Sequence, residues 1–149
     1  MKYLMIIALL LSLLVAFPAC SSATNMPIVL ISDYGTDDYR VPRLKGVIYS
    51  TNPDAEIIDA THGIGSVDIA AGAYILGLTA AEFPKDVIFM AAVGSAEKSI
   101  VLINDKDQIF VLPDDGLATF VAMNMGVKKC YAITNQDLFS QPIENLSTH

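Results

Sequence analysis

Cysteine is scarce in this sequence and tryptophan is absent: the 149 residues include two cysteines, Cys20 and Cys130. Cys20 belongs to an apolar N-terminal segment, which leaves Cys130 alone in the rest of the chain. A single cysteine excludes both an internal disulfide and a cysteine-rich zinc site in that part. We therefore expect Cys130, which precedes an apolar stretch, to be a small buried apolar residue.

Positive charge is also in short supply. The chain has 9 Lys and Arg residues against 16 Asp and Glu residues, a formal net charge of −7 at pH 7. An acidic protein does not attract nucleic acids or anionic membranes, so neither class of partner is expected. The sequence also lacks a G-x-G-x-x-G, a G-x-x-x-x-G-K-[ST] and a calcium-binding loop pattern. No Ser/His/Asp series or Cys/His pair stands out. These absences leave dinucleotide, P-loop, metal and nucleophile sites without support.

The first 23 residues are the most apolar part of the chain. Met1 and Lys2 precede an apolar run over 3–17, and small residues follow it, as in a secretory signal peptide. The run is shorter than the roughly 20 apolar residues that a membrane-spanning helix needs. Three alternatives stay open: cleavage after Ala23, cleavage before a lipidated Cys20 as in a bacterial lipoprotein, and an uncleaved membrane anchor. We expect an exported protein, periplasmic or secreted, which the lipoprotein alternative attaches to a membrane.

The remaining part, about 126 residues, has the size of one ordinary domain. Strand-like and helix-like segments alternate along it, which predicts an α/β three-layer sandwich with a largely parallel central sheet. The expected strands are 28–32, 56–60, 86–92, 99–104, 108–112 and 129–133. The expected helices are 41–50, 67–82 and 117–125, and the second of these is apolar on all sides, as in a buried helix. The polar C-terminal stretch fits either a complete domain with a frayed end or the front part of a longer protein.

Three acidic residues follow the first expected strand, in the sequence ISDYGTDDY. Asp33 ends the strand and precedes Tyr34 and Gly35. Ligands of open α/β sheets bind beyond the carboxyl ends of strands, where a carboxylate can accept hydrogen bonds from both hydroxyl groups of a ribose. An Asp at this place can also cap the following helix, so both roles stay open for Asp33. Asp37 and Asp38 are expected to serve as helix caps.

Two further stretches combine polar residues with strand ends. His62, in DATHGIG, can act as a ligand or a base, or can cap the strand before it. Asp114 lies in LPDDGLAT, whose Pro-Asp-Asp-Gly string forms a turn by itself and can equally present Asp114 to a ligand at the same sheet edge. Spacing alone does not decide between the structural and the binding roles.

Taken together, a series of stretches in the same order resembles the N-terminal domain of the S-adenosylmethionine hydroxide adenosyltransferase family, which also contains fluorinases and chlorinases. They are ISDYGTDDY, LKGVIYSTNPDAEIIDATHGI, AGAYIL with FPKDVIFMAAV, VLPDDGLAT and the closing STH. The series covers essentially all of residues 26–149, so we expect a signal segment over 1–23 and a family domain over 26–149. The family's C-terminal β-barrel domain has no counterpart in the sequence, which implies a truncated protein.

The resemblance also implies a function. Members of the family are trimers that bind S-adenosylmethionine at subunit interfaces, and a water-derived or halide nucleophile displaces methionine from the 5′ carbon. By this resemblance Asp33 holds the ribose hydroxyl groups, and Tyr34, Gly35 and Asp114 belong to the same substrate site. S-adenosylmethionine is then the substrate, and no separate cofactor is expected.

The sequence departs from the family where the hydroxide-using members activate water. Those members carry an Asp-Pro-Gly-Val-Gly loop and then an Arg pair, whereas this chain has AAVGSAEKSIVLI, with Lys98 and Ser99 in place of the arginines. Lysine cannot reproduce the planar arginine fork. His149 is the candidate for the family's catalytic histidine, without its flanking residues. Two hypotheses follow: an adenosyltransferase or hydrolase that releases adenosine and methionine, or a catalytically silent, exported nucleoside-binding domain. Whether the chain is an enzyme stays open.

Overall fold

The computed structural model describes residues 25–135, which form six strands and three helices. The strands are β1 (Ile28–Ser32), β2 (Ile57–Thr61), β3 (Ile88–Ala92), β4 (Ser99–Ile103), β5 (Ile109–Pro113) and β6 (Lys129–Ala132). The helices are α2 (Arg40–Thr51), α3 (Ile69–Glu82) and α4 (Thr119–Met125). Each strand and helix expected from the sequence is present, with bounds that differ by at most two residues.

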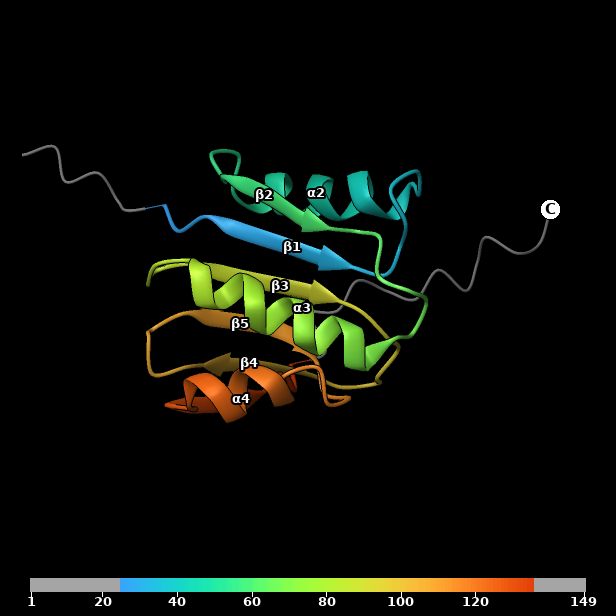
Figure 1. Cartoon of the computed structure of the whole chain (residues 1–149). Helices are drawn as coiled ribbons and strands as arrows, with labels where there is room; N and C mark the ends of the chain where they lie inside the picture. Colours follow the sequence, from blue (N-terminus) through green and yellow to red (C-terminus); the bar gives the residue numbers. More distant parts are fainter. Residues whose placement is uncertain (1–24, 136–149) are drawn as a thin grey trace, which may run out of the picture.

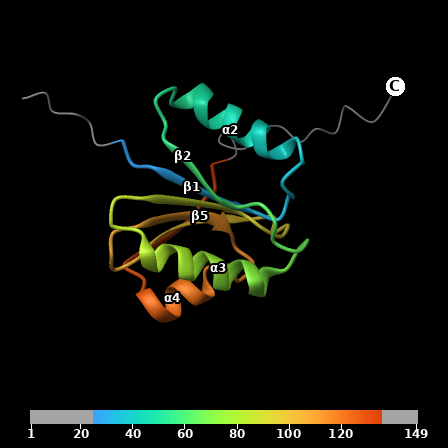
Figure 2. The same cartoon turned by 45° about the horizontal axis from the view of Figure 1, so that its top comes forward.

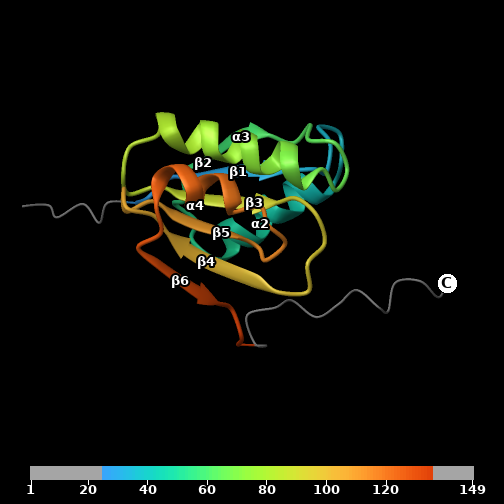
Figure 3. The same ribbon diagram turned by 60° about the horizontal axis from the view of Figure 1, so that its bottom comes forward.

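The strands form one mixed sheet in the order β2-β1-β3-β5-β4-β6 (Figure 1). β1 pairs in parallel with β2 and β3, and β3 pairs in parallel with β5. β4 and β5 form a hairpin that places β5 between β3 and β4, and β6 pairs with β4 at the outer edge; both pairings are antiparallel (Figure 3). The neighbouring strands β2, β1, β3 and β5 therefore end at the same edge of the sheet, which confirms the expected largely parallel α/β arrangement.

The sheet is the middle of three layers, with α2 on one face and α3 and α4 on the other (Figure 2). The main core lies under α3 and α4, where the rings of Phe89 and Phe110 stack with centroids 5.0 Å apart. A smaller core around Leu30 and Ile48 joins α2 to the β2–β1–β3 half of the sheet. The three-layer sandwich thus has one thick and one thin core.

Helices α3 and α4 pack closely because α3 presents a glycine to α4. A Cβ atom on Gly77 would collide with the ring of Phe120. The same ring packs edge-on against Tyr74, one turn earlier in α3, with centroids 5.3 Å apart. The glycine in this alanine-rich helix is therefore a packing requirement.

Two expectations about burial are wrong. The outer side of α3 is open, with Tyr74 and Leu78 53% and 48% exposed, because within residues 25–135 no further layer covers the helices. Cys130 is exposed rather than buried, because it lies on the edge strand β6, whose residues all face solvent. Both errors concern which side of an element is covered.

A buried polar network joins the β4–β5 hairpin to the end of α3. Gln108 is fully buried, and its Nε2 lies 2.9 Å from the carbonyl oxygens of Ala80, Phe83 and Pro84. Its Oε1 accepts a hydrogen bond of 2.8 Å from the buried side chain of Asn104. The last carbonyl groups of a helix have no partner within the helix, so this amide satisfies groups that would otherwise be buried unpaired.

Within residues 25–135, no helix has the length and apolar character to cross a membrane. The segment 1–23 and Cys20, on which the expectations of export and lipidation rest, lie outside the described residues.

Gln108→Leu is predicted to destabilise the fold by about 2 kcal/mol, because leucine fills the space but leaves buried carbonyl groups without a donor. Urea denaturation followed by circular dichroism measures the change. Lys106→Ala is the control: Lys106 Nζ also reaches the carbonyl oxygens of Ala81 and Phe83, but at the surface. Its loss should cost about 0.5 kcal/mol or less. Equal midpoints for Gln108→Leu and the natural protein would contradict the role of the network.

Candidate functional site

The carboxyl ends of β1, β3 and β5 lie side by side at one edge of the sheet (Figure 1). Asp33 follows β1, Gly94 follows β3 and Asp114 follows β5. Neighbouring strands are about 4.8 Å apart, so the ends of β1 and β5 are separated by about 10 Å. This edge is the place where open α/β sheets bind ligands.

Asp33 is half-buried, and backbone donors fix its carboxylate. Oδ2 accepts hydrogen bonds from the N–H groups of Val67 (3.0 Å) and Gly94 (3.1 Å), in the loops that follow β2 and β3. The Asp33 N–H donates to the carbonyl oxygen of Ala92 (3.2 Å). Oδ1 has no hydrogen-bond partner within residues 25–135 and is not buried. One carboxylate oxygen thus holds the side chain in place, and the other is open to a ligand.

The start of α2 excludes one of the two roles that the sequence left open for Asp33, that of helix cap. The first helical N–H, that of Arg40, donates to Asp38 Oδ1 (2.8 Å), so Asp38 serves the helix terminus as expected and Asp33 does not. The Arg40 guanidinium also donates to both oxygens of Asp38 at 2.9 Å, and this side-chain hydrogen bonding lowers the pKa of Asp38. The Arg40 guanidinium also lies over the ring of Tyr34, with Cζ 4.3 Å from the ring centroid. Asp37 is exposed and makes no such contact within the described residues.

Both donors to Asp33 have positive φ angles, 57° for Val67 and 82° for Gly94. Glycine adopts this conformation freely, but a β-branched residue rarely does. The Val67 side chain is 57% exposed, so side-chain packing does not explain its conformation. The hydrogen bond from the Val67 N–H to Asp33 instead stabilises this strained conformation. Backbone strain of this kind concentrates at functional sites.

The acid after β5 that points into the structure is Asp115 rather than Asp114. Asp114 is exposed, and its N–H donates to the carbonyl oxygen of Lys98 (2.9 Å). Asp115 Oδ1 accepts the Leu117 N–H (3.2 Å), while Oδ2 is buried against Gly94 and has no hydrogen-bond partner within residues 25–135. A Cβ atom on Gly94 would collide with this oxygen, so glycine is required there. Sequence reasoning missed Asp115, because both acids fit the same turn pattern.

His62 is buried at the end of β2 and joins β2 to β1. Its Nδ1 lies 2.7 Å from the hydroxyl oxygen of buried Ser32, and its carbonyl oxygen accepts the Gly35 N–H (2.7 Å). Its Nε2 lies 3.2 Å from Asp59 Oδ1, and Lys45 Nζ lies 2.5 Å from Asp59 Oδ2. Of the roles left open by the sequence, the structural one at the strand end fits this burial.

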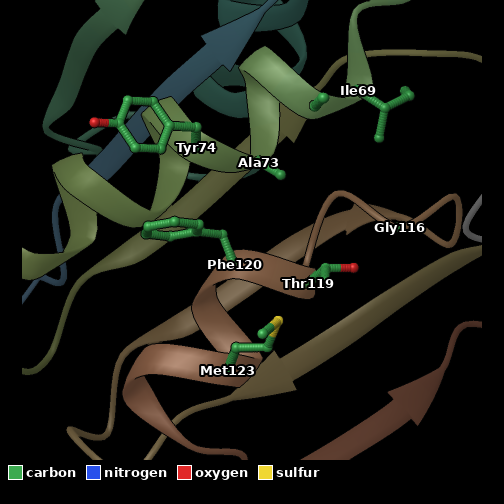
Figure 4. Close-up of a pocket in the computed structure, with 8 residues that line it drawn as sticks. Ile69, Ala73, Tyr74, Gly116, Thr119, Phe120 and Met123 are labelled. Carbon is green, nitrogen blue, oxygen red and sulfur yellow. The ribbon is translucent and has the colours of Figure 1, made fainter.

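The described surface is hollowed near the helices and near the carboxyl edge of the sheet. The larger hollow, about 380 Å³, is an apolar groove between α3 and α4 (Figure 4). The smaller, about 230 Å³, lies between α2 and the ends of β3, β4 and β5, beside the carboxyl edge. Neither is lined by Asp33 or Asp114. Neither hollow is therefore, by itself, the ribose site that the sequence predicts.

The structure brings some of the predicted site residues together. Asp33, Tyr34 and Gly35 form one turn after β1, whereas Asp114 lies two strands away at the same edge. His149, the candidate catalytic residue, lies outside the described residues. Within residues 25–135, no group of three His, Cys, Asp or Glu side chains is placed to hold a metal ion.

The sequence profile of the SAM hydroxide adenosyltransferase N-terminal domain matches residues 28–148. The chain belongs to this family. It is 36% identical over 116 residues to an (R)-S-adenosyl-L-methionine hydrolase of Methanocaldococcus jannaschii, an alignment that covers 73% of this chain and 44% of the relative. It is 29% identical over 138 residues to a fluorinase of an Actinoplanes species, over 74% of this chain and 46% of the relative.

A solved structure supports the same family fold. The crystal structure of an uncharacterized conserved protein from Thermotoga maritima, 35% identical in sequence, matches with a TM-score of 0.71. The match covers 75% of this chain and 45% of that protein. The chain thus spans slightly less than half the length of the relatives that it matches.

Asp115→Asn is predicted to stabilise the protein by about 1 kcal/mol, because it removes the negative charge of a carboxylate whose Oδ2 is buried without a donor, and keeps the acceptor for Leu117. Thermal unfolding at neutral pH measures the change. Asp114→Asn is the matched control: it alters the adjacent, exposed carboxylate and should leave the melting temperature unchanged. A lower melting temperature for Asp115→Asn than for Asp114→Asn would show that the Asp115 charge stabilises the edge.

Proposed function

We propose that this chain binds the adenosine moiety of S-adenosylmethionine, with Asp33 accepting hydrogen bonds from the ribose hydroxyl groups. The observation that carries the proposal is that the two oxygens of the Asp33 carboxylate have different surroundings. Oδ2 is held by Val67 and Gly94, while Oδ1 remains accessible at the carboxyl edge. A fixed anionic acceptor suits a vicinal diol, whose two hydroxyl groups both donate. Family membership supports an adenosyl ligand over other diols.

The neighbours of Asp33 extend the proposed site. Tyr34 and Gly35 continue the same turn and would contact the nucleoside beside the ribose. Asp114, at the end of β5, would contact the substrate from the other side of Gly94. The distance of about 10 Å between the ends of β1 and β5 is one that S-adenosylmethionine can bridge.

The reaction that we propose is displacement of methionine from the 5′ carbon by a water-derived or halide nucleophile, which leaves adenosine or its halogenated analogue. The sulfonium group is a good leaving group, so the protein contributes by orienting the reactants and by excluding bulk water. Asp33 would fix the ribose and thereby the 5′ carbon. S-adenosylmethionine is the substrate, and the proposal includes no further cofactor.

A catalytically silent nucleoside-binding domain is the second candidate function. The observation that favours it is the loop over 93–98, which lies between β3 and β4. The loop contains no Asp and no Arg, and its charged side chains, Glu97 and Lys98, are exposed. Loss of catalytic groups that act together lowers the rate by many orders of magnitude.

We further propose that the chain acts as a homotrimer in which a neighbouring copy helps to complete the substrate site. Exposed apolar side chains over α3 and α4, among them Tyr74, Leu78 and Met123, support an interface on that side. Exposed apolar surface of this kind marks interaction sites on soluble proteins.

Export belongs to the proposal as well, through cleavage of 1–23 or through lipid attachment at Cys20. Its support is the apolar run with a small-residue exit. Because S-adenosylmethionine is made in the cytoplasm, export favours the silent candidate.

Adenosine is predicted to raise the melting temperature of the protein, and Asp33→Ala to abolish the rise. A ligand at a hundred times its dissociation constant stabilises the folded state by about 2.7 kcal/mol. Differential scanning fluorimetry measures the shift. Asp37→Ala, which removes an exposed carboxylate from the same segment, is the control and should keep the full shift. The absence of any shift at millimolar adenosine would remove the ligand claim.

Incubation with S-adenosylmethionine separates the two candidate functions. For the enzyme, liquid chromatography should show adenosine and methionine rising together, and Asp33→Ala should suppress both products. For the silent domain, the time course stays flat although adenosine still raises the melting temperature.

A further inference from the structure

We propose that His62 is the positioning residue for Asp33: its side chain and its backbone hold the two ends of the Ser32–Gly35 turn, and nucleoside binding depends on that hold. The inference deepens the proposed function and rests on it, because the ligand in question is the adenosine moiety bound by Asp33.

The turn that carries Asp33 is tied to His62 at both ends. At the first end, Ser32 Oγ lies 2.7 Å from His62 Nδ1, with the two residues 0% and 8% exposed. At the other end, the Gly35 N–H donates to the His62 carbonyl oxygen, also at 2.7 Å. Between them, the Tyr34 N–H makes a longer contact of 3.4 Å with Ser32 Oγ. One residue, His62 at the end of β2, therefore holds both ends of the turn from which the Asp33 side chain extends.

The far side of the imidazole faces the ion pair of Asp59 and Lys45. Nε2 faces Asp59 Oδ1 at 3.2 Å, and Lys45 from α2 holds the other Asp59 oxygen. Burial raises the pKa of Asp59, but hydrogen bonds from Lys45 and His62 outweigh it, and the pKa lies below its ordinary value. In either tautomer of the imidazole, Nδ1 pairs with the Ser32 hydroxyl group, as acceptor or as donor. The chain of contacts runs from α2 through β2 to the turn after β1.

These residues have the types of a nucleophilic triad, but their arrangement excludes that chemistry. Ser32 is fully buried, so its hydroxyl group cannot reach a substrate. The hydroxyl group is paired with His62, and the residue that follows Ser32 is Asp33. His62 therefore acts on the ligand through the geometry of Asp33.

Three variants separate the hold on the turn from the general stability of the fold. His62→Asn keeps an amide atom at the place of Nδ1 and can still pair with Ser32. His62→Gln places its amide near Nε2 and leaves Ser32 without a partner, and Ser32→Ala removes the same hydrogen bond from the other side. Gln108→Leu is the control, because it weakens a buried network at the opposite end of α3.

Isothermal titration calorimetry with adenosine gives the expected results. His62→Gln and Ser32→Ala should each weaken binding about tenfold, the equivalent of one hydrogen bond, and His62→Asn should stay within about threefold of the natural protein. Gln108→Leu should lower the melting temperature and leave the affinity unchanged. Natural affinity in His62→Gln and Ser32→Ala would overturn the proposal. Affinities that follow melting temperature in every variant, Gln108→Leu included, would also overturn it, since His62 would then be only structural.

Failure of the natural protein to bind adenosine would refute the proposed function. Hydrogen exchange then tests separately whether His62 holds the Ser32–Gly35 turn. The amides of Gly35, Val67 and Gly94 report whether the turn and the Asp33 carboxylate keep their place. Their exchange, relative to amides of α3, should quicken about tenfold in His62→Gln and Ser32→Ala but not in His62→Asn. Unchanged relative exchange in the first two variants would overturn the positioning role.

Discussion

Two backbone N–H groups, from Val67 and Gly94, converge on one oxygen of Asp33, and the arrangement of the sheet edge depends on that convergence. The two donors lie in the loops after β2 and β3, the strands that flank β1 on either side. A half-buried carboxylate is costly unless it is hydrogen-bonded, and charge-assisted bonds to backbone N–H groups are among the strong ones. One side chain thus joins the ends of three parallel strands and is itself oriented by them.

The same convergence explains where the edge is strained. Val67 takes a positive φ that its branched side chain disfavours, and Gly94 has a φ of 82°, at which any side chain would be strained and would also meet Asp115. Asp115 then keeps one oxygen buried without a donor. Backbone geometry that aims Asp33 is therefore obtained at the expense of local stability, a pattern typical of sites that act on a ligand.

Local patterns in the sequence predicted the elements and the class of fold, because strand and helix periodicity depend on neighbouring residues. These patterns failed to predict burial and side-chain pairing, which depend on residues that are distant in the sequence. Cys130 is exposed because β6 became the edge of the sheet, and Tyr74 is exposed because nothing described covers α3. The pairing of Ser32 with His62, 30 residues apart, follows from the register of β1 against β2, which no motif states. Asp33, by contrast, was predictable, because its place at a strand end is itself a local feature.

The charges at the edge bear on the proposed substrate, whose sulfonium group is cationic. Of the acids near the carboxyl ends, Asp38 is matched by Arg40 and Asp59 by Lys45. Asp33 is satisfied by backbone groups that carry no net charge, and within the described residues Asp114 and Asp115 form no ion pair. Arg40 lies close enough to Asp33 to interact with it electrostatically, so the negative charge without a cationic partner among the described residues is that of Asp114 and Asp115, on the other side of Gly94 from the position proposed for the ribose. A sulfonium at the 5′ carbon would supply the positive charge that this edge lacks, and that attraction is strongest where water is excluded.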